Sequence, residues 1–398
     1  MADTRRIVYV HHGKGIGGAP LSLLYLIRGL DRDAYTPSVL CLHESEASEM
    51  YRREGIETEV LRGVRDFSHT NVLWYPWWQW PKILARLVHL PFAIDRARRW
   101  LQSHPCDIVH LNTSTLLAFG IAAKRAGIKV VWHVREPLAR GYFGWRRALV
   151  RAVIRHNADI VIPICRYDAE QLTPAPNIHV VYNFVDFTQF HSGIDGSAVR
   201  AELGIAPGAP VAVFLGGMSR VKGTREFVAA ALRVLETKKD AVFLIAGQLP
   251  GPGLRATLSG ARKYRSDVER MIPASAAASI RFIGVRRDVP QLLAAADYLV
   301  FPSTVAHFAR PVIEASAMGK PVIASDIGGP RELVRDGETG LLVPPSDDAA
   351  LAGAMLRLIE DPDGARRLGA NGTLFAQEQF DAQKNVRRVI TLYESLFE

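Results

Sequence analysis

The sequence predicts an α/β fold made of two doubly wound domains, each with a parallel sheet, that face each other across a cleft. Short apolar runs alternate with helical patterns along the chain, as in repeated strand–helix units. The 398 residues, 48% of them hydrophobic, exceed the ~250–300 at which one hydrophobic core stops growing. Glycines and prolines gather between residues 185 and 210. This segment therefore divides the chain into halves of similar size.

Each apolar run that precedes a helical pattern is assigned to a strand, and the first helix is expected over Pro20–Leu30 because proline suits a first helical turn. In the first half the expected strands are Arg6–Val10, Ser38–Leu42, Ile108–Leu111, Lys129–His133 and Ile160–Pro163. In the second half they are Val211–Leu215, Ala241–Ala246, Ile280–Ile283, Tyr298–Phe301 and Val322–Ala324.

Composition narrows the class of protein. Basic residues outnumber acidic ones by 49 to 40, a net charge of +9 that favours an anionic partner. Three cysteines without CxxC spacing indicate neither a disulfide framework nor a zinc site. The chain lacks a run of ~18 apolar residues, and its first apolar run is too short for a secretory signal. We expect a cytoplasmic protein that is not an integral membrane protein.

Residues 13–18 read Gly-Lys-Gly-Ile-Gly-Gly after the first strand, formally a G-x-G-x-x-G fingerprint. One interpretation is a nicotinamide dinucleotide site, which needs an acid at the end of the second strand; Glu44 is the nearest candidate. A second is a tight turn chosen for its geometry. The third is a loop where a phosphate or a sugar approaches the backbone closely.

Three segments of the second half place loops after strands, where open α/β sheets bind ligands: 214–223, 280–288 and 301–325. Pro311 can open a helix whose N-terminal N–H groups face an anion, and Lys222 adds a positive charge. Glu314, one turn inside that helix, can accept two hydrogen bonds from a ribose diol.

With VYNFVDFTQF at 181–190 and GLLVPP at 340–345, these segments resemble the retaining nucleotide-sugar glycosyltransferases of the GT-B fold, in particular glycosyltransferase family 4. The resemblance implies two Rossmann-like domains. An acceptor-binding domain is expected over 1–190, with a C-terminal helix over 376–398 that packs back onto it. A domain that binds the nucleotide-sugar donor is expected over 191–375.

The resemblance also implies roles for single residues. Lys222 neutralises the donor diphosphate, Glu314 binds the ribose, and His133, otherwise a core histidine, lies beside the transferred sugar. Glu136 and His133 are the candidates to orient the acceptor hydroxyl, with Glu136 as a base. The other residues implied at the donor site are Gly17, Gly18, Gly217, Arg220, Gly284, Val285, Arg286, His307, Phe308, Ala309 and Arg310.

Two positions depart from the family pattern. Gly217 stands where the phosphate-binding turn usually has an arginine, and Arg220 is the nearest substitute. Ala306 stands where the family has the first of two paired acids, a residue that contacts the donor sugar. These departures keep open a nucleotide-sugar-binding protein with weak or no turnover.

The middle of the first half is basic and aromatic. Residues 74–80 read Trp-Tyr-Pro-Trp-Trp-Gln-Trp, and residues 62–155 contain 16 basic and 4 acidic side chains. The amphipathic stretch 82–100 has a proline break at Pro91. Segment 74–100 either docks on an anionic membrane surface or packs its aromatic residues into the core. No nucleic-acid-binding motif accompanies the charge.

We therefore expect a retaining glycosyltransferase that uses a nucleoside-diphosphate sugar, with UDP favoured, and neither a cofactor nor a metal. The expected acceptor is a glycan or lipid-linked glycan of cell-surface polysaccharide or lipopolysaccharide assembly, reached from the inner face of the plasma membrane. The alternatives are a nucleotide-sugar epimerase of the same fold, a binding protein, and the nicotinamide oxidoreductase.

Overall fold

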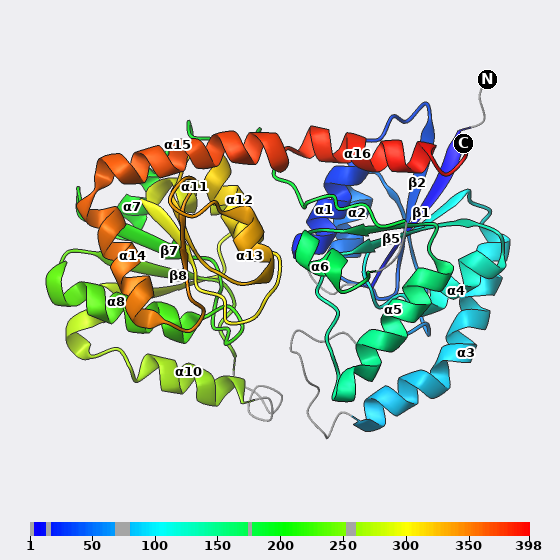
Figure 1. Ribbon diagram of the computed structural model, residues 1–398, viewed down its shortest axis with the longest axis horizontal. Helices are drawn as coiled ribbons and strands as arrows, with labels where there is room; N and C mark the ends of the chain where they lie inside the picture. Colours follow the sequence, from blue (N-terminus) through cyan, green and yellow to red (C-terminus); the bar gives the residue numbers. More distant parts are fainter. Residues whose placement is uncertain (1–3, 13–16, 68–79, 174–176, 252–259) are drawn as a thin grey trace. The chain divides into compact units, whose positions relative to one another are not determined.

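The computed structural model describes residues 4–12, 17–67, 80–173, 177–251 and 260–398, which form two compact units (Figure 1). One unit contains Met1–Asn183 and Ala382–Glu398, and the other is Phe184–Asp381. These bounds differ from the expected 190 and 375. The reason is that the N–H of Val185 donates to the carbonyl oxygen of Phe380 at 2.8 Å, and Val185 pairs with Asp381. The two segments in which the chain passes from one unit to the other, at 184–185 and 380–381, are thereby paired with each other within the second unit.

The first unit has a six-stranded sheet of order β3-β2-β1-β4-β5-β6, in which each pair of neighbours is parallel. This is a doubly wound order with its switch point between β1 and β4. Its strands are β1 (Arg5–His11), β2 (Tyr35–Cys41), β3 (Glu57–Val60), β4 (Ile108–Leu111), β5 (Lys129–Val134) and β6 (Ile160–Pro163). The predicted strands are all present, while the edge strand β3 was not expected.

The helices of the first unit lie on both faces of this sheet. They are α1 (Gly18–Arg28), α2 (Glu46–Arg53), α3 (Trp80–Ser103), α4 (Leu117–Arg125), α5 (Trp145–Asn157), α6 (Arg166–Glu170) and α16 (Ala382–Glu394), with a 3-10 turn at Tyr142–Gly144. Helices α3, α4 and α5 share one core with the sheet, centred on the fully buried Trp132. Helix α3 runs through Pro91, so the predicted break there was wrong.

The second unit repeats this architecture. Its parallel sheet has the order β12-β11-β10-β7-β8-β9, which is the strand order of the first unit when its strands are counted from β7. The strands are β7 (Val211–Phe214), β8 (Val242–Ala246), β9 (Ile280–Gly284), β10 (Tyr298–Phe301), β11 (Val322–Ser325) and β12 (Leu341–Val343). The sequence predicted five of them but not β12, and the predicted α/β class with two doubly wound sheets is confirmed.

The helices of the second unit surround that sheet (Figure 1). They are α7 (Ser197–Glu202), α8 (Thr224–Thr237), α10 (Ala261–Glu269), α11 (Val289–Ala295), α12 (Arg310–Ala317), α13 (Gly328–Leu333), α14 (Asp348–Glu360) and α15 (Pro362–Gln379), with a 3-10 turn at Ala274–Ala276. In the described part of the chain, no helix combines the length and the apolar character that crossing a bilayer requires.

Candidate functional site

The turn between β7 and α8 carries Lys222 and is held by one buried hydroxyl. The Oγ1 of Thr224 accepts from the N–H of Ser219 at 2.9 Å and donates to the carbonyl oxygen of Gly217 at 2.7 Å. Gly223 begins α8 with φ +84°, and a Cβ there would lie 1.8 Å from the carbonyl oxygen of Pro302. Only glycine fits this left-handed conformation and close approach.

The atoms around residue 217 also require a glycine at this position. Gly217 has φ +60°, and a Cβ on it would lie 2.6 Å from the carbonyl oxygen of Gln248. Its N–H donates to the carbonyl oxygen of Ala246 at 2.8 Å. The turn is thus docked on the end of β8, and the departure from the family's arginine follows from this packing.

The Lys222 turn is bound to the loop that precedes α12. The Oγ of Ser303 donates to the carbonyl oxygen of Val221 at 2.9 Å, and the Oγ1 of Thr304 donates to that of Arg220 at 3.0 Å. Oγ of Ser303 also lies 3.2 Å from the Nδ1 of His307. Two segments that are 82 to 84 residues apart in the sequence are therefore hydrogen-bonded to each other at the carboxyl ends of β7 and β10.

Lys222 is a cation with little water around it. Burial lowers the pKa of its ammonium group, and its charge contributes to the lowered pKa of the neighbouring His307, where burial is the larger cause. Among the described residues, the ion pairs do not include Lys222, and burial is the cause of its lowered pKa. A buried charge without a counter-ion is costly, so this ammonium is suited to an anionic ligand.

Glu314 lies inside α12 and faces Arg310 one turn earlier. The Nε of Arg310 donates to the Oε1 of Glu314 at 2.6 Å, and the two side chains are 12% and 10% exposed. Burial raises the pKa of Glu314, and Arg310 partly opposes that shift. Ala309, the N-terminal cap of α12, is fully buried, while His307 and Phe308 before it are partly exposed.

The predicted base-binding segment lies at the end of β9. Gly284 has φ +70°, and Val285 is 66% exposed. Arg286 forms ion pairs with Glu202 and Asp288, each at 2.5 Å, and these carboxylates raise the pKa of its guanidinium. Its charge is therefore already balanced within the protein, and the predicted contact of this segment with a base stays a prediction.

Arg220 is exposed and lies over the ring of Tyr264, with 4.7 Å from the guanidinium carbon to the ring centroid. It lines a hollow of about 530 Å³ together with residues of α8 and α10, in a set that does not include Lys222. The predicted role of Arg220 at the donor site stays a prediction.

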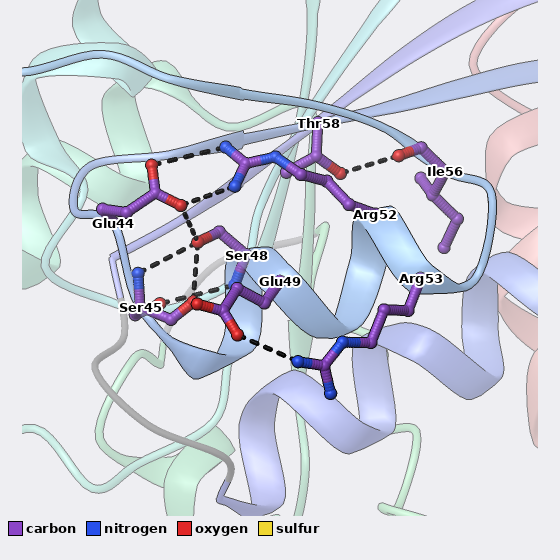
Figure 2. A network of polar contacts seen from close by, with 8 residues as sticks. All are labelled: Glu44, Ser45, Ser48, Glu49, Arg52, Arg53, Ile56 and Thr58. Atoms are coloured by element: carbon purple, nitrogen blue, oxygen red, sulfur yellow. Dashed lines mark hydrogen bonds and ion pairs between the residues drawn. The ribbon is translucent and has the colours of Figure 1, made fainter.

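In the first unit, Gly17 caps the start of α1 and Gly18 is its first residue, whereas residues 13–16 of the glycine-rich loop lie outside the described part. Glu44, the acid that a dinucleotide site would need, follows β2. Its Oε1 accepts from Nη1 of Arg52 at 2.5 Å and from Oγ of Ser48 at 3.0 Å (Figure 2). The carboxylate is thus paired at the start of α2.

His133 is 2% exposed and belongs to a buried polar cluster that follows β1, β4 and β5. Its Nδ1 lies 3.2 Å from Nε2 of His110 and 3.4 Å from Nη2 of Arg135. Arg135 also donates to the side-chain oxygens of Asn112 at 2.5 Å and Asn183 at 2.7 Å. Burial, and secondarily Arg135, hold the pKa of His133 well below its usual range.

Glu136 holds the loop after β4. Its Oε1 accepts from Oγ1 of Thr113 at 2.5 Å and from both the N–H and the Oγ of Ser114, at 2.9 and 2.5 Å. With three donors on one oxygen, the carboxylate is a structural acceptor, and its predicted role as a base stays a prediction.

The sequence analysis did not identify Arg135, Asn112, His110 or His11 as members of this cluster. They come from three strands and their neighbouring loops, so no local spacing relates them. The available signal was a polar residue at the carboxyl end of each of β1, β4 and β5, where ligands bind in open sheets.

Comparison with known proteins relates both units to glycosyltransferases. Residues 16–189 match the family described as Glycosyltransferase Family 4, and residues 209–361 match Glycosyl transferases group 1. The alpha-maltose-1-phosphate synthase of Mycolicibacterium smegmatis is 31% identical over 279 residues, which cover 66% of this chain and 69% of that protein. The lipopolysaccharide core biosynthesis mannosyltransferase LpsB of Rhizobium meliloti is 27% identical over 301 residues, covering 74% of this chain and 81% of LpsB.

The fold has a full-length counterpart among solved structures. The crystal structure of Anabaena Alr3699/HepE in complex with UDP and glucose matches with a TM-score of 0.79 at 22% identity, covering 98% of this chain and 100% of that one. The resemblance read from the sequence is confirmed. The chain belongs to the family 4 glycosyltransferases and has the GT-B fold.

Proposed function

We propose that this glycosyltransferase transfers a sugar from a nucleoside-diphosphate sugar, with UDP as the nucleotide, to a hydroxyl acceptor, with retention of configuration and without a metal. One observation carries the proposal. The Lys222 ammonium is mostly buried without an anionic neighbour among the described residues, in a turn bonded to the loop before α12.

In the proposed reaction the bond between the sugar C1 and the diphosphate oxygen breaks, and its electron pair stays on the diphosphate. The acceptor oxygen bonds to C1 on the same face and gives its proton to the departing phosphate. Lys222 and the N–H groups at the start of α12 stabilise the charge that develops there. Glu314, held by Arg310, binds the ribose, and the backbone of Gly284–Arg286 contacts the base.

The relatives support the choice of donor and acceptor class. The HepE structure contains UDP and glucose, which favours a UDP-sugar as the donor. LpsB acts in lipopolysaccharide core biosynthesis, which favours a glycan or lipid-linked glycan acceptor of the cell surface. A nicotinamide cofactor is not part of the proposal, because Glu44 is paired with Arg52.

We further propose that the first unit reaches a lipid-linked acceptor by docking α3 on an anionic bilayer. Leu84, Val88 and Phe92 lie four residues apart and are 61%, 64% and 70% exposed, so they form one apolar stripe. The exposed arginines that follow, at 96, 98 and 99, outnumber the acid Asp95, with which two of them pair. Apolar burial and basic charge together are what a bilayer-surface helix uses. Segment 74–79 lies outside the described residues.

Thermal unfolding with nucleotides tests the proposed donor site. UDP at 100 times its dissociation constant should stabilise the wild-type protein by ~2.7 kcal/mol. The Lys222→Met variant, which keeps the apolar stem, should show a much smaller stabilisation at the same concentration. Lys239→Met, at an exposed position of the same unit, is the matched control. If no nucleoside diphosphate raises the melting temperature of the wild type, the proposed donor is wrong.

A further inference from the structure

A chain of buried polar side chains crosses the first unit on the face of the sheet that α16 covers. Tyr9 of β1 and His110 of β4 are partners in the strand register, and both are fully buried. The hydroxyl of Tyr393, from α16, lies 2.7 Å from Nδ1 of His110 and 3.3 Å from the hydroxyl of Tyr9. The Nε2 of His110 continues the chain to Nδ1 of His133 at 3.2 Å.

Arg135 determines where the proton of His133 lies. A guanidinium group only donates hydrogen bonds, so any atom that it contacts must accept. Its Nη2 contacts the Nδ1 of His133, and that nitrogen therefore carries no proton. Burial keeps the ring neutral, so the single proton of His133 lies on Nε2.

The same argument fixes the direction of the rest of the chain. Because Nδ1 of His133 is an acceptor, His110 donates to it from Nε2–H. The Nδ1 of His110 is then an acceptor, and the hydroxyl of Tyr393 donates to it. The oxygen of Tyr393 in turn accepts from the hydroxyl of Tyr9. Helix α16 thus supports the orientation of a histidine on β5.

Arg135 acts on a second histidine through Asn112. Its Nε donates to the side-chain oxygen of Asn112, so the amide nitrogen must point the other way. That nitrogen lies 3.1 Å from Nδ1 of His11 and donates to it. The proton of His11, a neutral ring whose pKa burial lowers to about 3, therefore lies on Nε2.

The Nε2 of His11 is an unsatisfied buried donor. His11 is 1% exposed, and its Nε2 has no hydrogen-bond partner among the residues that the structure describes. Within the described part of the chain, both side-chain hydrogen bonds of His133 are made by Nδ1, so its Nε2–H remains available to an acceptor. Both histidines lie at the carboxyl ends of strands β1 and β5, which flank β4 in the sheet. Buried donors without partners are rare in proteins, and a ligand oxygen would account for the Nε2–H of His11.

The family resemblance already implies that His133 lies beside the transferred sugar. We propose that Arg135 is a positioning residue that fixes His11 and His133 as neutral rings protonated on Nε2, and that the Nε2–H of His11 is a second donor to hydroxyl oxygens of the sugar substrate. This inference rests on the proposed glycosyl transfer. His133 then serves as a hydrogen-bond donor rather than as a proton-accepting base, and His11 becomes a second sugar-binding residue.

Two substitutions at each histidine separate a donor from a base. Glutamine keeps an amide N–H near the position of Nε2, whereas methionine has a similar length and no donor. We expect His133→Gln and His11→Gln to retain transfer rates within about tenfold of the wild type. The methionine variants should lose about 10²–10³-fold, the usual effect of removing one preorganised donor. Equal losses for Gln and Met at His133 overturn its assignment as a donor, and equal rates for His11→Met and wild type overturn that of His11.

Nitrogen-15 chemical shifts of the histidine rings test the role of Arg135 in the free protein. The wild type should show an unprotonated Nδ1 and a protonated Nε2 for both His11 and His133. Arg135→Met should give mixed tautomers at His133, and Asn112→Leu should give mixed tautomers at His11. A proton on Nδ1 of His133 in the wild type overturns the proposal even if Arg135→Met does not fold. If the wild-type protein transfers no sugar, the proposed function is refuted. The nitrogen-15 chemical shifts then still test the tautomers of His11 and His133 independently.

Discussion

Gly217 and Gly247 lie backbone against backbone, where the loops after β7 and β8 meet. A Cβ on Gly247 would lie 2.6 Å from the nitrogen of Gly217, and a Cβ on Gly217 would lie 2.9 Å from the carbonyl carbon of Gly247. The arginine that the family pattern has at residue 217 therefore cannot be placed here without moving one of the loops. The packing of the local backbone, and not only the choice of donor substrate, therefore accounts for a glycine instead of an arginine at residue 217.

We predict that Gly217→Ala destabilises the protein by about 2–4 kcal/mol, from the left-handed backbone and the clash together. Gly337→Ala is the matched control, because Gly337 has a similar φ of +72° and no atom within 4 Å of the added Cβ. It should cost only about 1–2 kcal/mol. Chemical denaturation measures both. Equal losses would show that the close approach of the loops does not matter.

Lys222→Met should lower kcat/KM for transfer by about 10²–10³-fold. The melting temperature without ligand should stay the same or rise, because the substitution removes a buried charge that lacks a counter-ion among the described residues. A lysine that only stabilises the fold gives the opposite pattern, a lower melting temperature with transfer retained by the folded fraction.

Glu314→Gln should weaken free UDP and the UDP-sugar by a similar factor, since a ribose contact is made equally in both. Glutamine still accepts a hydrogen bond from Arg310, so the fold should tolerate it better than Glu314→Ala, which removes the carboxylate that pairs with a mostly buried guanidinium at a cost of about 3 kcal/mol. Calorimetric titration gives both affinities. A collapse of kcat with unchanged affinity would place Glu314 at the sugar instead.

Acid should destabilise the first unit. Burial, with smaller contributions from His12 and Arg135, lowers the pKa of His11 to about 3, and burial also lowers those of His110 and His133. The unfolded chain binds these protons near pH ~6.5, so the free energy of unfolding is full above that pH and falls as the pH drops toward 3.

Tryptophan fluorescence in urea measures this slope, because all seven tryptophans belong to the first unit. His11→Gln should flatten part of the slope. The exposed His191 gives a control variant, His191→Gln, which should follow the wild type. If the wild-type midpoint does not change between pH 7 and pH 4, these rings do not stay neutral.

Replacing Leu84, Val88 and Phe92 by serine should release the protein from anionic vesicles without changing UDP affinity. The stripe is already exposed, so the fold should change little. Wild-type binding should weaken with salt, because the Debye length is only ~8 Å at physiological ionic strength. Leu374→Ser, at a 66% exposed leucine of α15, is the control. If the wild type ignores anionic vesicles at low salt, the acceptor does not require docking through α3.

The sequence predicted ten strands because their apolar runs are long enough to be recognised. It missed β3 and β12, which lie at sheet edges; β3 reads Glu-Thr-Glu-Val, with Val60 as its one apolar residue, and β12 has three residues. Pro91 falls within α3, whose opposite face packs on α4 through Ala93 and Ala97, and this tertiary contact overrides the local signal. Local secondary-structure propensity alone could not predict these two edge strands or the continuation of α3 through Pro91.

The sequence predicted only those residues of the candidate site that belong to motifs of the family. Lys222, His307 and Glu314 stand in motifs, and the hydrogen bonds of Ser303 and Thr304 bring their loops together. Apart from the contact between Arg135 and the nearby His133, the hydrogen bonds around Arg135 join residues separated by 23 to 101 positions, and the chemistry of the cluster depends on which atom donates. Such a relationship exists only in three dimensions.

One turnover measurement tests the central claim most directly. The protein is incubated with UDP-, GDP- and ADP-sugars, with and without lipid-linked glycan acceptors, and released nucleotide and sugar-labelled product are quantified together. We predict release of UDP that requires an acceptor, matches the labelled product mole for mole, keeps the anomeric configuration, persists in a metal chelator, and disappears in Lys222→Met. Isomerised sugar without transfer, or tight nucleotide binding without turnover across a broad acceptor panel, would contradict it.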